Sequence, residues 1–393
     1  MSVLQQFLSK SHSPFTGAGG TGASLTSHVF KPRIPNRSLI HGYASFAERD
    51  YTLRDWIKIV LIGGFFHLTT LFLRIGGRPL KEGIISSFSW FFYRVLRDKR
   101  KIALINLDLV YGDSISEARK QEITRGMFRH FMRMILDLIF SELYWPDHKL
   151  LRYVGNVSSE PVDRTIAEGR GFALISGHVG NLEMMQHVAT ARGYPMVTVY
   201  KGFRGSWFDL FIGRKRLARG NGLIEIPSSR HKIINGKRTK VEQRGIRRLV
   251  EEVWDNGGGI AFASDQYARR SRVQMPFLGI PDCPMQVGLM RYVVKNRIPF
   301  TLHALVYDPQ GNPRWICSDP VFVESQGTHD QTLRHYMTIM NEWLEARIHE
   351  YPEQFYWGHR RFGRSYYERP RKVLNTDERD TAAVQVEAER PSR

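Results

Sequence analysis

The chain has 393 residues, of which 42% are hydrophobic and 12% aromatic, and this composition excludes a wholly disordered chain. Its 57 Lys and Arg exceed its 38 Asp and Glu, which gives a formal net charge of +19. We therefore expect acidic partners, such as nucleic acid, an anionic lipid surface or an acidic protein. A mean hydropathy of −0.34 excludes a polytopic membrane protein. The two cysteines, Cys283 and Cys317, lack metal-ligand spacing, and we interpret them as buried free thiols.

The N-terminal part of the chain combines a polar tail with two apolar segments. Residues 1–45 are rich in Gly, Ser and Thr without lasting periodicity, which predicts a flexible tail. Trp56–Leu73 and Ile84–Leu96 are apolar, and the second ends in the basic run RDKRK. The first is shorter than the about 20 residues that a spanning helix needs, so a short span, an interfacial helix and a buried core helix remain open. Aromatics beside a Lys/Arg cluster favour membrane attachment, and we assign residues 46–150 to a helical membrane-associated region.

Apolar strands alternate with amphipathic helices from about residue 170 onward. This pattern predicts an α/β fold with a mostly parallel central sheet covered by helices. We assign residues 151–372 to this domain, preceded by the N-terminal helical membrane-associating region. The domain contains a polar, basic insertion at residues 227–244, and a disordered charged tail is expected at residues 373–393.

The motif GHVGNLE at residues 177–183 directly follows the apolar strand FALIS. His178 and Glu183 would not share one face of a continuous helix, but they converge if His178 lies on the turn and Asn181 caps the following helix. Glu183 would then orient the imidazole, and the free ring nitrogen would act as a general base. No Ser or Cys nucleophile stands in a matching motif, so the base most simply activates a substrate hydroxyl. The alternative is a strand-end His with an ordinary first-turn acid.

GHVGNLE resembles the HxxxxE/D signature of glycerolipid-type O-acyltransferases, and more specifically that of the lipid A late acyltransferases, the lauroyl/myristoyl transferase family. Four further segments resemble that family in the same order and extend the resemblance to roughly residues 79–370. They are KRKIALINLDLVYGD, VTVYKGFRGSWFD with GRKR, FASDQYARRSRVQMPFLG and YPEQFYWGHRRFGR. The chain departs from the family pattern at Lys201, where Arg is usual, and at Gly205-Ser206, where Asn-Pro is usual. The FPEGTR phosphate motif is absent, which argues against a glycerol-3-phosphate acceptor.

The resemblance implies acyl transfer from an acyl carrier protein thioester to a hydroxyl of a lipid A precursor or related glycolipid. His178 would be the base and Glu183 its orienting partner, with no covalent intermediate. The amides around Gly177–Val179 or Arg216 would hold the oxyanion, and Asp265 would order Arg216 or bind the acceptor. Substrate-binding roles are expected for Asn181, Lys201, Arg216, Asp265 and Gln266.

We expect no metal and no cofactor, because acyl carrier protein or coenzyme A would bring the acyl group as part of a co-substrate. The expected partners are acyl carrier protein, the glycolipid and the inner membrane surface, with the catalytic domain on the cytoplasmic side. The segment WGHRRF at residues 357–362 is interpreted as structural or membrane-proximal. Three alternatives remain: an acyltransferase for another membrane lipid, an inactive membrane scaffold, and a basic nucleic-acid-binding protein, although no nucleic-acid-binding motif is present.

Overall fold

The computed structural model describes residues 29–30, 34, 36–49, 51–144, 146–155, 159–202, 207–226, 231–234, 237–240, 245–267, 272–363 and 365–368. The tail predicted at 373–393 and most of the tail predicted at 1–45 lie outside these residues. Part of the predicted tail is packed, since His41 N–H donates to Leu223 O at 2.9 Å and Ser45 Oγ donates to Glu225 at 2.8 Å. The basic insertion 227–244 is described only as the hairpin β6 (His231–Ile234) and β7 (Lys237–Lys240).

The core of the fold is a six-stranded sheet with the order β12-β11-β3-β8-β4-β5. All neighbouring strands are parallel except β12, which pairs with β11 antiparallel at one edge. The structure therefore confirms the predicted mostly parallel sheet. Its strands are β3 (Phe172–Ser176), β4 (Met196–Lys201), β5 (Gly222–Ile226), β8 (Gly259–Ala263), β11 (Phe300–Tyr307) and β12 (Pro313–Cys317).

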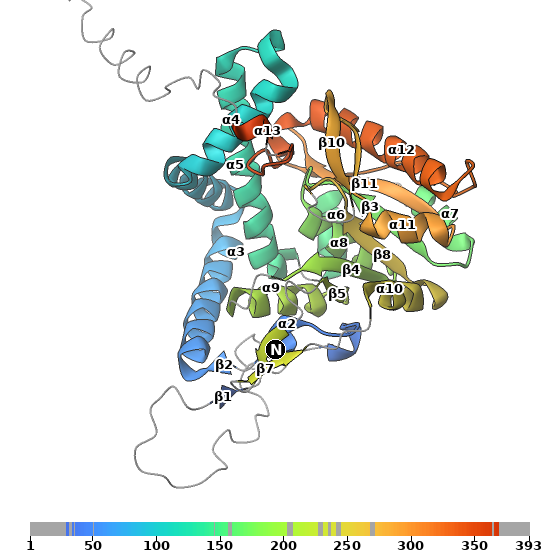
Figure 1. The fold of residues 1–393 in the computed structure, drawn as a ribbon. Helices are drawn as coiled ribbons and strands as arrows, with labels where there is room; N and C mark the ends of the chain where they lie inside the picture. The colour runs from blue at the N-terminus through green and yellow to red at the C-terminus, as the bar shows by residue number, and fades with distance from the viewer. Residues whose placement is uncertain are drawn as a thin grey trace, which may run out of the picture.

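Helices cover both faces of the sheet because each central strand is apolar on both sides. In β3, Ala173 and Ile175 face the cluster that contains α10, α11 and α12, whereas Phe172 and Leu174 face the cluster with α6, α7 and α8. The result is a three-layer α/β domain (Figure 1). These helices are α6 (Asp147–Val154), α7 (Glu160–Ala167), α8 (Leu182–Ala191), α10 (Ile246–Asp255), α11 (Gly288–Lys295) and α12 (His329–Glu350).

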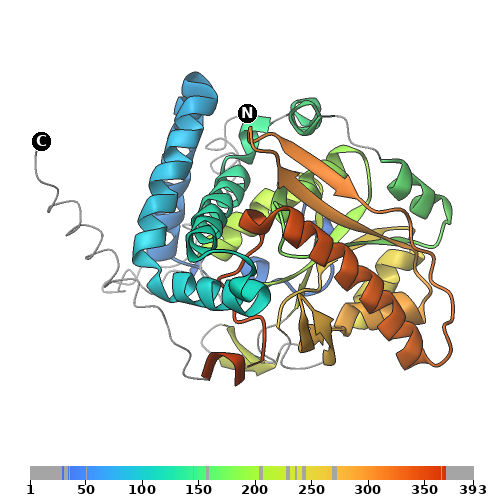
Figure 2. The same ribbon diagram turned by 90° about the horizontal axis from the view of Figure 1, so that it is seen from above.

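A long helix, α3 (Leu53–Val95), stands at the outer side of the domain, and α5 (Glu117–Ile139) lies between it and the sheet (Figure 1, Figure 2). The two apolar segments predicted separately are both part of α3. A break at Gly77, which has φ 58° and ψ −151°, separates them, and Pro79 contributes because it cannot donate to the helix. Among the described residues, α3 is the one helix long and apolar enough to cross a bilayer.

The two sides of α3 differ along almost its whole length. The inner side packs on the domain, with Ile59 in a cluster with Phe46 and Tyr93 against Phe128 at a ring distance of 5.6 Å. The outer side is exposed and apolar, and its large residues follow helical spacing. They are Ile57, Val60, Leu61, Phe65, Leu68, Leu71, Phe72, Ile75, Leu80, Phe88, Trp90, Phe91 and Val95.

Smaller elements complete the described structure. The short strand β2 (Tyr51–Thr52) pairs with β1 (Val29–Phe30), and Thr52 caps α3 by accepting a hydrogen bond from Asp55 N–H. The remaining helices and strands are α2 (Ser45–Glu48), α4 (Arg97–Tyr111), α9 (Trp207–Ala218), the hairpin β9 (Arg272–Phe277) with β10 (Ile280–Gln286), and α13 (Ser365–Glu368). The short 3-10 segments are η1 (Arg37–Leu39), η2 (Gly112–Ser114), η3 (Ser141–Tyr144) and η4 (Pro352–Gln354).

Candidate active site

The candidate site forms where β3 and β8 end side by side. The two strands are parallel neighbours, and Ser176 at the end of β3 is paired with Ala263 at the end of β8. Two residues further along each strand stand His178 and Asp265. This shared register brings an imidazole and a carboxylate together at the carboxyl edge of the sheet, where α/β proteins place their sites.

The His178 ring has a partner at each nitrogen. Nδ1 lies 2.7 Å from Asp265 Oδ1, and Nε2 lies 2.8 Å from the Gln266 amide nitrogen. An ionised carboxylate only accepts hydrogen bonds, whereas an amide nitrogen only donates. The neutral ring therefore carries its proton on Nδ1, and Nε2 is the basic nitrogen. Asp265 Oδ2 also accepts the His178 backbone N–H at 2.8 Å, so one carboxylate fixes both the main chain and the ring.

Charge pairing tunes both members of this pair. Burial lowers the pKa of His178, but the charge and hydrogen bond of Asp265 raise it by more, so the pKa lies above its ordinary value of 6.5. Burial raises the pKa of Asp265, but the charge and hydrogen bonds of His178 lower it by more, so the pKa lies below its ordinary value of 3.8. Asp265 is therefore ionised at neutral pH, and His178 is a stronger base than a free imidazole.

Glycines on both sides of His178 permit this close packing. A Cβ at Gly177 would lie 2.9 Å from Leu344 and 3.2 Å from the Asp265 carboxyl carbon. Gly180 has a φ of 76°, and a Cβ there would lie 2.2 Å from the Leu305 carbonyl oxygen. Any side chain at Gly180 would thus be excluded by both conformation and space.

A third segment, from the C-terminal part of the chain, closes the site. Gly180 N–H donates to Gln354 O at 2.9 Å, and Tyr356 N–H donates to His178 O at 3.1 Å. The residues that follow bring His359 and Arg361 to a small pocket shared with His178, Asp265 and Gln266. The segment WGHRRF, interpreted from the sequence as structural, therefore contributes side chains to the wall of this pocket.

Glu183 does not contact His178 as the sequence predicted; it binds Arg216. Arg216 Nε donates to Glu183 Oε2 at 2.9 Å, and a second guanidinium nitrogen bonds Oε1. Asp265, in turn, pairs with His178 and not with Arg216. The reason is geometric, because Glu183 lies in the first turn of α8 while Asp265 directly follows the neighbouring strand. Burial raises the pKa of Glu183, but Arg216 lowers it by more, to below 4.5.

Asn181 has the predicted position, since it is the N-cap of α8 and its Oδ1 accepts a hydrogen bond from Met184 N–H at 3.0 Å. Its side-chain nitrogen donates to Tyr307 Oη at 2.7 Å and to Asp137 at 3.1 Å. These three bonds lie within the protein, so the structure gives Asn181 a role in holding the loop after β3.

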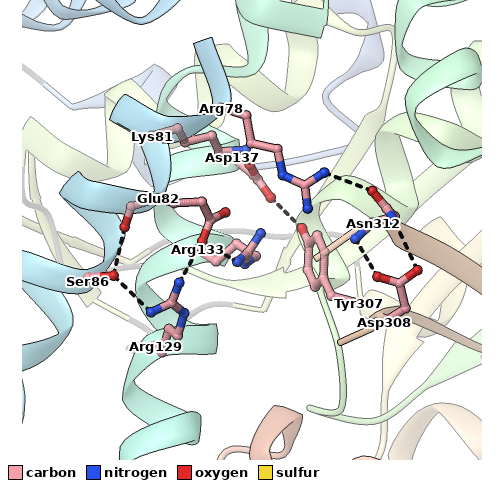
Figure 3. Close-up of polar contacts among 10 residues, drawn as sticks. All are labelled: Arg78, Lys81, Glu82, Ser86, Arg129, Arg133, Asp137, Tyr307, Asp308 and Asn312. Carbon is pink, nitrogen blue, oxygen red and sulfur yellow. Dashed lines mark hydrogen bonds and ion pairs between the residues drawn. The ribbon is translucent and has the colours of Figure 1, made fainter. Parts of the chain in front are cut away.

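Asp137 links this loop to the outer helix α3. Figure 3 shows Asp137 between Lys81 of α3 and Tyr307 of β11, with both side chains directed toward its carboxylate. Next to it, Glu82 of α3 accepts hydrogen bonds from Arg129 at 2.7 Å and Arg133 at 2.8 Å. A buried carboxylate that accepts from a cation, a phenol and an amide is well compensated, so the network ties α3, α5 and the site together.

The other predicted residues have different outcomes. Gln266 lies at the basic nitrogen of His178. Lys201 ends β4 with an exposed side chain, and its substrate-binding role remains a prediction. Sequence reasoning did not identify Asp137, Tyr307 or Arg361 as parts of the site, because each comes from a distant element. In the described ranges, no three His, Cys, Asp or Glu gather in an arrangement that could hold a metal ion.

Comparisons with known proteins show the family of the chain. The family model "Bacterial lipid A biosynthesis acyltransferase" matches residues 45–364. The chain is 22% identical over 272 residues to the lipid A biosynthesis palmitoleoyltransferase of Escherichia coli K12, and likewise to the lipid A biosynthesis acyltransferase of Shigella flexneri. Each match covers 68% of this chain and 79% of the relative. The matched region contains β3, β8 and the whole pocket around His178, and the chain belongs to the bacterial lipid A biosynthesis acyltransferase family.

Proposed function

We propose that this enzyme transfers a fatty acyl group from an acyl carrier protein thioester to a hydroxyl of a lipid A precursor or a related glycolipid, with His178 as the general base. The observation that carries the proposal is the orientation of His178. Asp265 holds the proton on Nδ1, and the basic Nε2 accepts from the Gln266 amide in a residue that lines a pocket. A base with its proton fixed on the far nitrogen suits removal of a proton from a hydroxyl.

Asp265 takes the orienting role that the sequence assigned to Glu183. In the proposed reaction the acceptor hydroxyl replaces the Gln266 amide at His178 Nε2. The imidazolium that forms is stabilised by Asp265, which is already ionised. Glu183 fixes Arg216 beside the Tyr200 ring, at 5.0 Å, and this pair takes no part in the proposed proton transfer. The activated hydroxyl then attacks the thioester directly, so acyl transfer needs no covalent acyl-enzyme.

An acidic donor is supported by basic side chains near the pocket. Arg97, Lys99 and Lys101 are exposed at the start of α4. Burial is the main cause that lowers the pKa of His359, and the charges of His178, Arg361 and Lys99 lower it further. Arg360 is also exposed, next to the two pocket residues His359 and Arg361. Acyl carrier protein offers a complementary acidic surface, and such pairing accelerates encounter.

The outer side of α3 supports attachment to the inner membrane. Its inner side packs on the domain near both ends, at Ile59 and at Tyr93. Crossing the bilayer would carry the charged groups of α5, such as Arg129 and Arg133, into hydrocarbon. We therefore propose that α3 lies on the membrane surface with its exposed apolar side in the lipid. The catalytic domain would face the cytoplasm, where a carrier protein can reach it.

Reconstitution with defined substrates tests the function. The purified enzyme in lipid nanodiscs would be given a lipid A precursor with acyl carrier protein loaded with palmitoleate, because the Escherichia coli relative is named for that group, or with palmitoleoyl-coenzyme A. We expect mass spectrometry to show the gain of one acyl group with the carrier-protein donor. Product from coenzyme A alone would show that the donor is wrong, and product only with a different membrane lipid would show that the acceptor is wrong.

Vesicle flotation tests the attachment. Leu68→Glu places a charge on the outer side of α3, where Leu68 is 53% exposed, and should release the enzyme from anionic vesicles. Phe322→Glu is the matched control, because Phe322 is an exposed apolar residue outside α3. Equal flotation of both variants would contradict membrane contact through this side of α3.

A further inference from the structure

Arg361 is a buried cation without an acidic contact. Arg361 is 3% exposed, and its guanidinium takes part in no ion pair among the described residues. One guanidinium nitrogen donates to Pro284 O at 3.1 Å, and the group lies over the Phe277 ring at 4.9 Å. Another nitrogen contacts Met285 Sδ. Nε is buried and has no hydrogen-bond partner in the described structure.

Such an arrangement lowers the stability of the fold. Taking a guanidinium out of water carries a penalty that an adjacent carboxylate usually offsets, and a buried donor without a partner adds to it. Burial accordingly lowers the pKa of Arg361. The backbone carbonyl and the ring hold the group in place but do not neutralise it.

The position of Arg361 indicates which anion it meets. Arg361 lines the same small pocket as His178 and Asp265. Its charge favours ionised Asp265 and opposes protonation of His178. The other arginine considered for the oxyanion, Arg216, is bound on two nitrogens by Glu183. Arg361 is therefore the pocket cation whose donors are not committed to a protein carboxylate.

We propose that Arg361 is a catalytic residue that binds the oxyanion formed from the donor carbonyl; the inference rests on the proposed acyl transfer. The acceptor oxygen attacks the thioester carbon and forms the new C–O bond while its proton moves to His178 Nε2. The carbonyl electron pair shifts to oxygen, where Arg361 stabilises the negative charge. When the electrons return, the C–S bond breaks, and the leaving thiolate takes the proton from His178. The products are an ester and a free thiol.

The test compares Arg361→Met with Arg219→Met in steady-state acyl transfer. Arg219 is a matched control, since it is a buried arginine bound to Asp147 and the Ser141 carbonyl, outside the pocket. We expect Arg361→Met to lower kcat about 10²–10³-fold, the loss typical for one oxyanion donor, with KM for both substrates nearly unchanged. Arg219→Met should keep wild-type kcat per folded molecule. Arg361→Lys should give an intermediate kcat because it keeps the charge but not the planar donor geometry.

Chemical rescue separates charge at the reacting atoms from folding. Added guanidinium at millimolar concentration should raise kcat of Arg361→Ala and leave Arg219→Ala unchanged. If Arg361→Met does not fold, Arg361→Lys is decisive, and wild-type kcat in that variant would overturn the inference. A wild-type kcat in Arg361→Met, or a loss confined to KM, would overturn it while acyl transfer by the wild type still stands. Absence of transfer by the wild type would reject the proposed function and this inference with it.

Discussion

Two side-chain pairs begin in the segment 177–183, one at His178 and one at Glu183, and they differ in exposure and in partner. The pair of His178 and Asp265 lies at a pocket, its imidazole side chain is 31% exposed, and Asp265 outweighs burial to raise the pKa of the imidazole. The pair of Glu183 and Arg216 is closed, with side chains 15% and 9% exposed and two hydrogen bonds. In the proposed mechanism, a motif residue near the base therefore serves the fold, while a carboxylate distant in the sequence serves the base.

Loss of the imidazole is the largest expected break. His178→Ala should lower kcat per folded molecule about 10²–10⁴-fold, because a positioned general base contributes that much. The melting temperature should also fall, because the buried Asp265 carboxylate loses its ring partner. Single-turnover acyl transfer measures the loss. His148→Ala is the control, since His148 is exposed on α6. Wild-type turnover in His178→Ala would refute the assignment of the base.

Breaking the closed pair should damage stability more than chemistry. Arg216→Met leaves the Glu183 carboxylate buried without its partner, which should cost about 3–5 kcal/mol. Denaturant unfolding of the purified protein measures this free energy. The exposed pair of Arg334 and Asp330 gives the control, where Arg334→Met should cost less than about 1 kcal/mol. A stable Arg216→Met enzyme that has lost turnover would instead place Arg216 in the chemistry.

Asp265→Asn should weaken the interaction with His178 while keeping a side chain of the same size beside the ring. The amide cannot stabilise the imidazolium and can present its NH2 group to Nδ1, which favours the wrong tautomer. We expect kcat to fall about 10²-fold, at the low end for general-base catalysis. Glu183→Gln is the direct comparison, and its kcat per folded molecule should stay near wild type. Equal losses in the two variants would contradict the separation of roles.

The smallest expected effect is on the pH dependence of activity, which reports on the pair of His178 and Asp265. His178 must be neutral to act, so activity should fall as pH drops through its pKa, which lies above 6.5. In Asp265→Asn this midpoint should move to lower pH, because the carboxylate that raises the pKa is gone. A pH–rate profile of kcat/KM checks both, and an unmoved midpoint would contradict the pairing.

The free energy of unfolding should also depend on pH, and the contributions of His178 and Glu183 should change in opposite directions. Its raised pKa stabilises the fold fully below 6.5, and this contribution disappears as pH rises through the folded pKa. Glu183 has a lowered pKa, so its contribution is present above 4.5 and is lost as pH falls through the folded pKa. Denaturant unfolding at several pH values would follow both.

The sequence predicts well what is local in the chain. The strand, turn and helix around His178 follow from an apolar run, two glycines and an N-cap, and the structure confirms Asn181 as that cap. The alternation of strands and helices likewise predicts the parallel sheet. By contrast, the kink in α3 comes from the conformation of Gly77, and apolar content alone does not reveal whether two apolar runs are one helix.

The partner of His178 could not be predicted for a different reason. Asp265 is 87 residues away in the chain, and its approach depends on β8 lying next to β3. Strand order is a property of the whole sheet, so spacing within GHVGNLE could only suggest the nearest carboxylate, Glu183. Arg361 reaches the pocket through a bridge between Val179 and Phe355, which no local pattern indicates.

The exposed apolar side of α3, opposite the side that packs on the domain, has a consequence for how the enzyme encounters its substrates. An enzyme held with one helix side in a bilayer searches for a lipid acceptor in two dimensions and for a carrier-protein donor in three. Its rate would then follow the mole fraction of acceptor in the membrane, and dilution of that lipid within the surface would slow turnover at constant bulk concentration. The proposed orientation of α3 on the membrane would thus make membrane composition a kinetic variable.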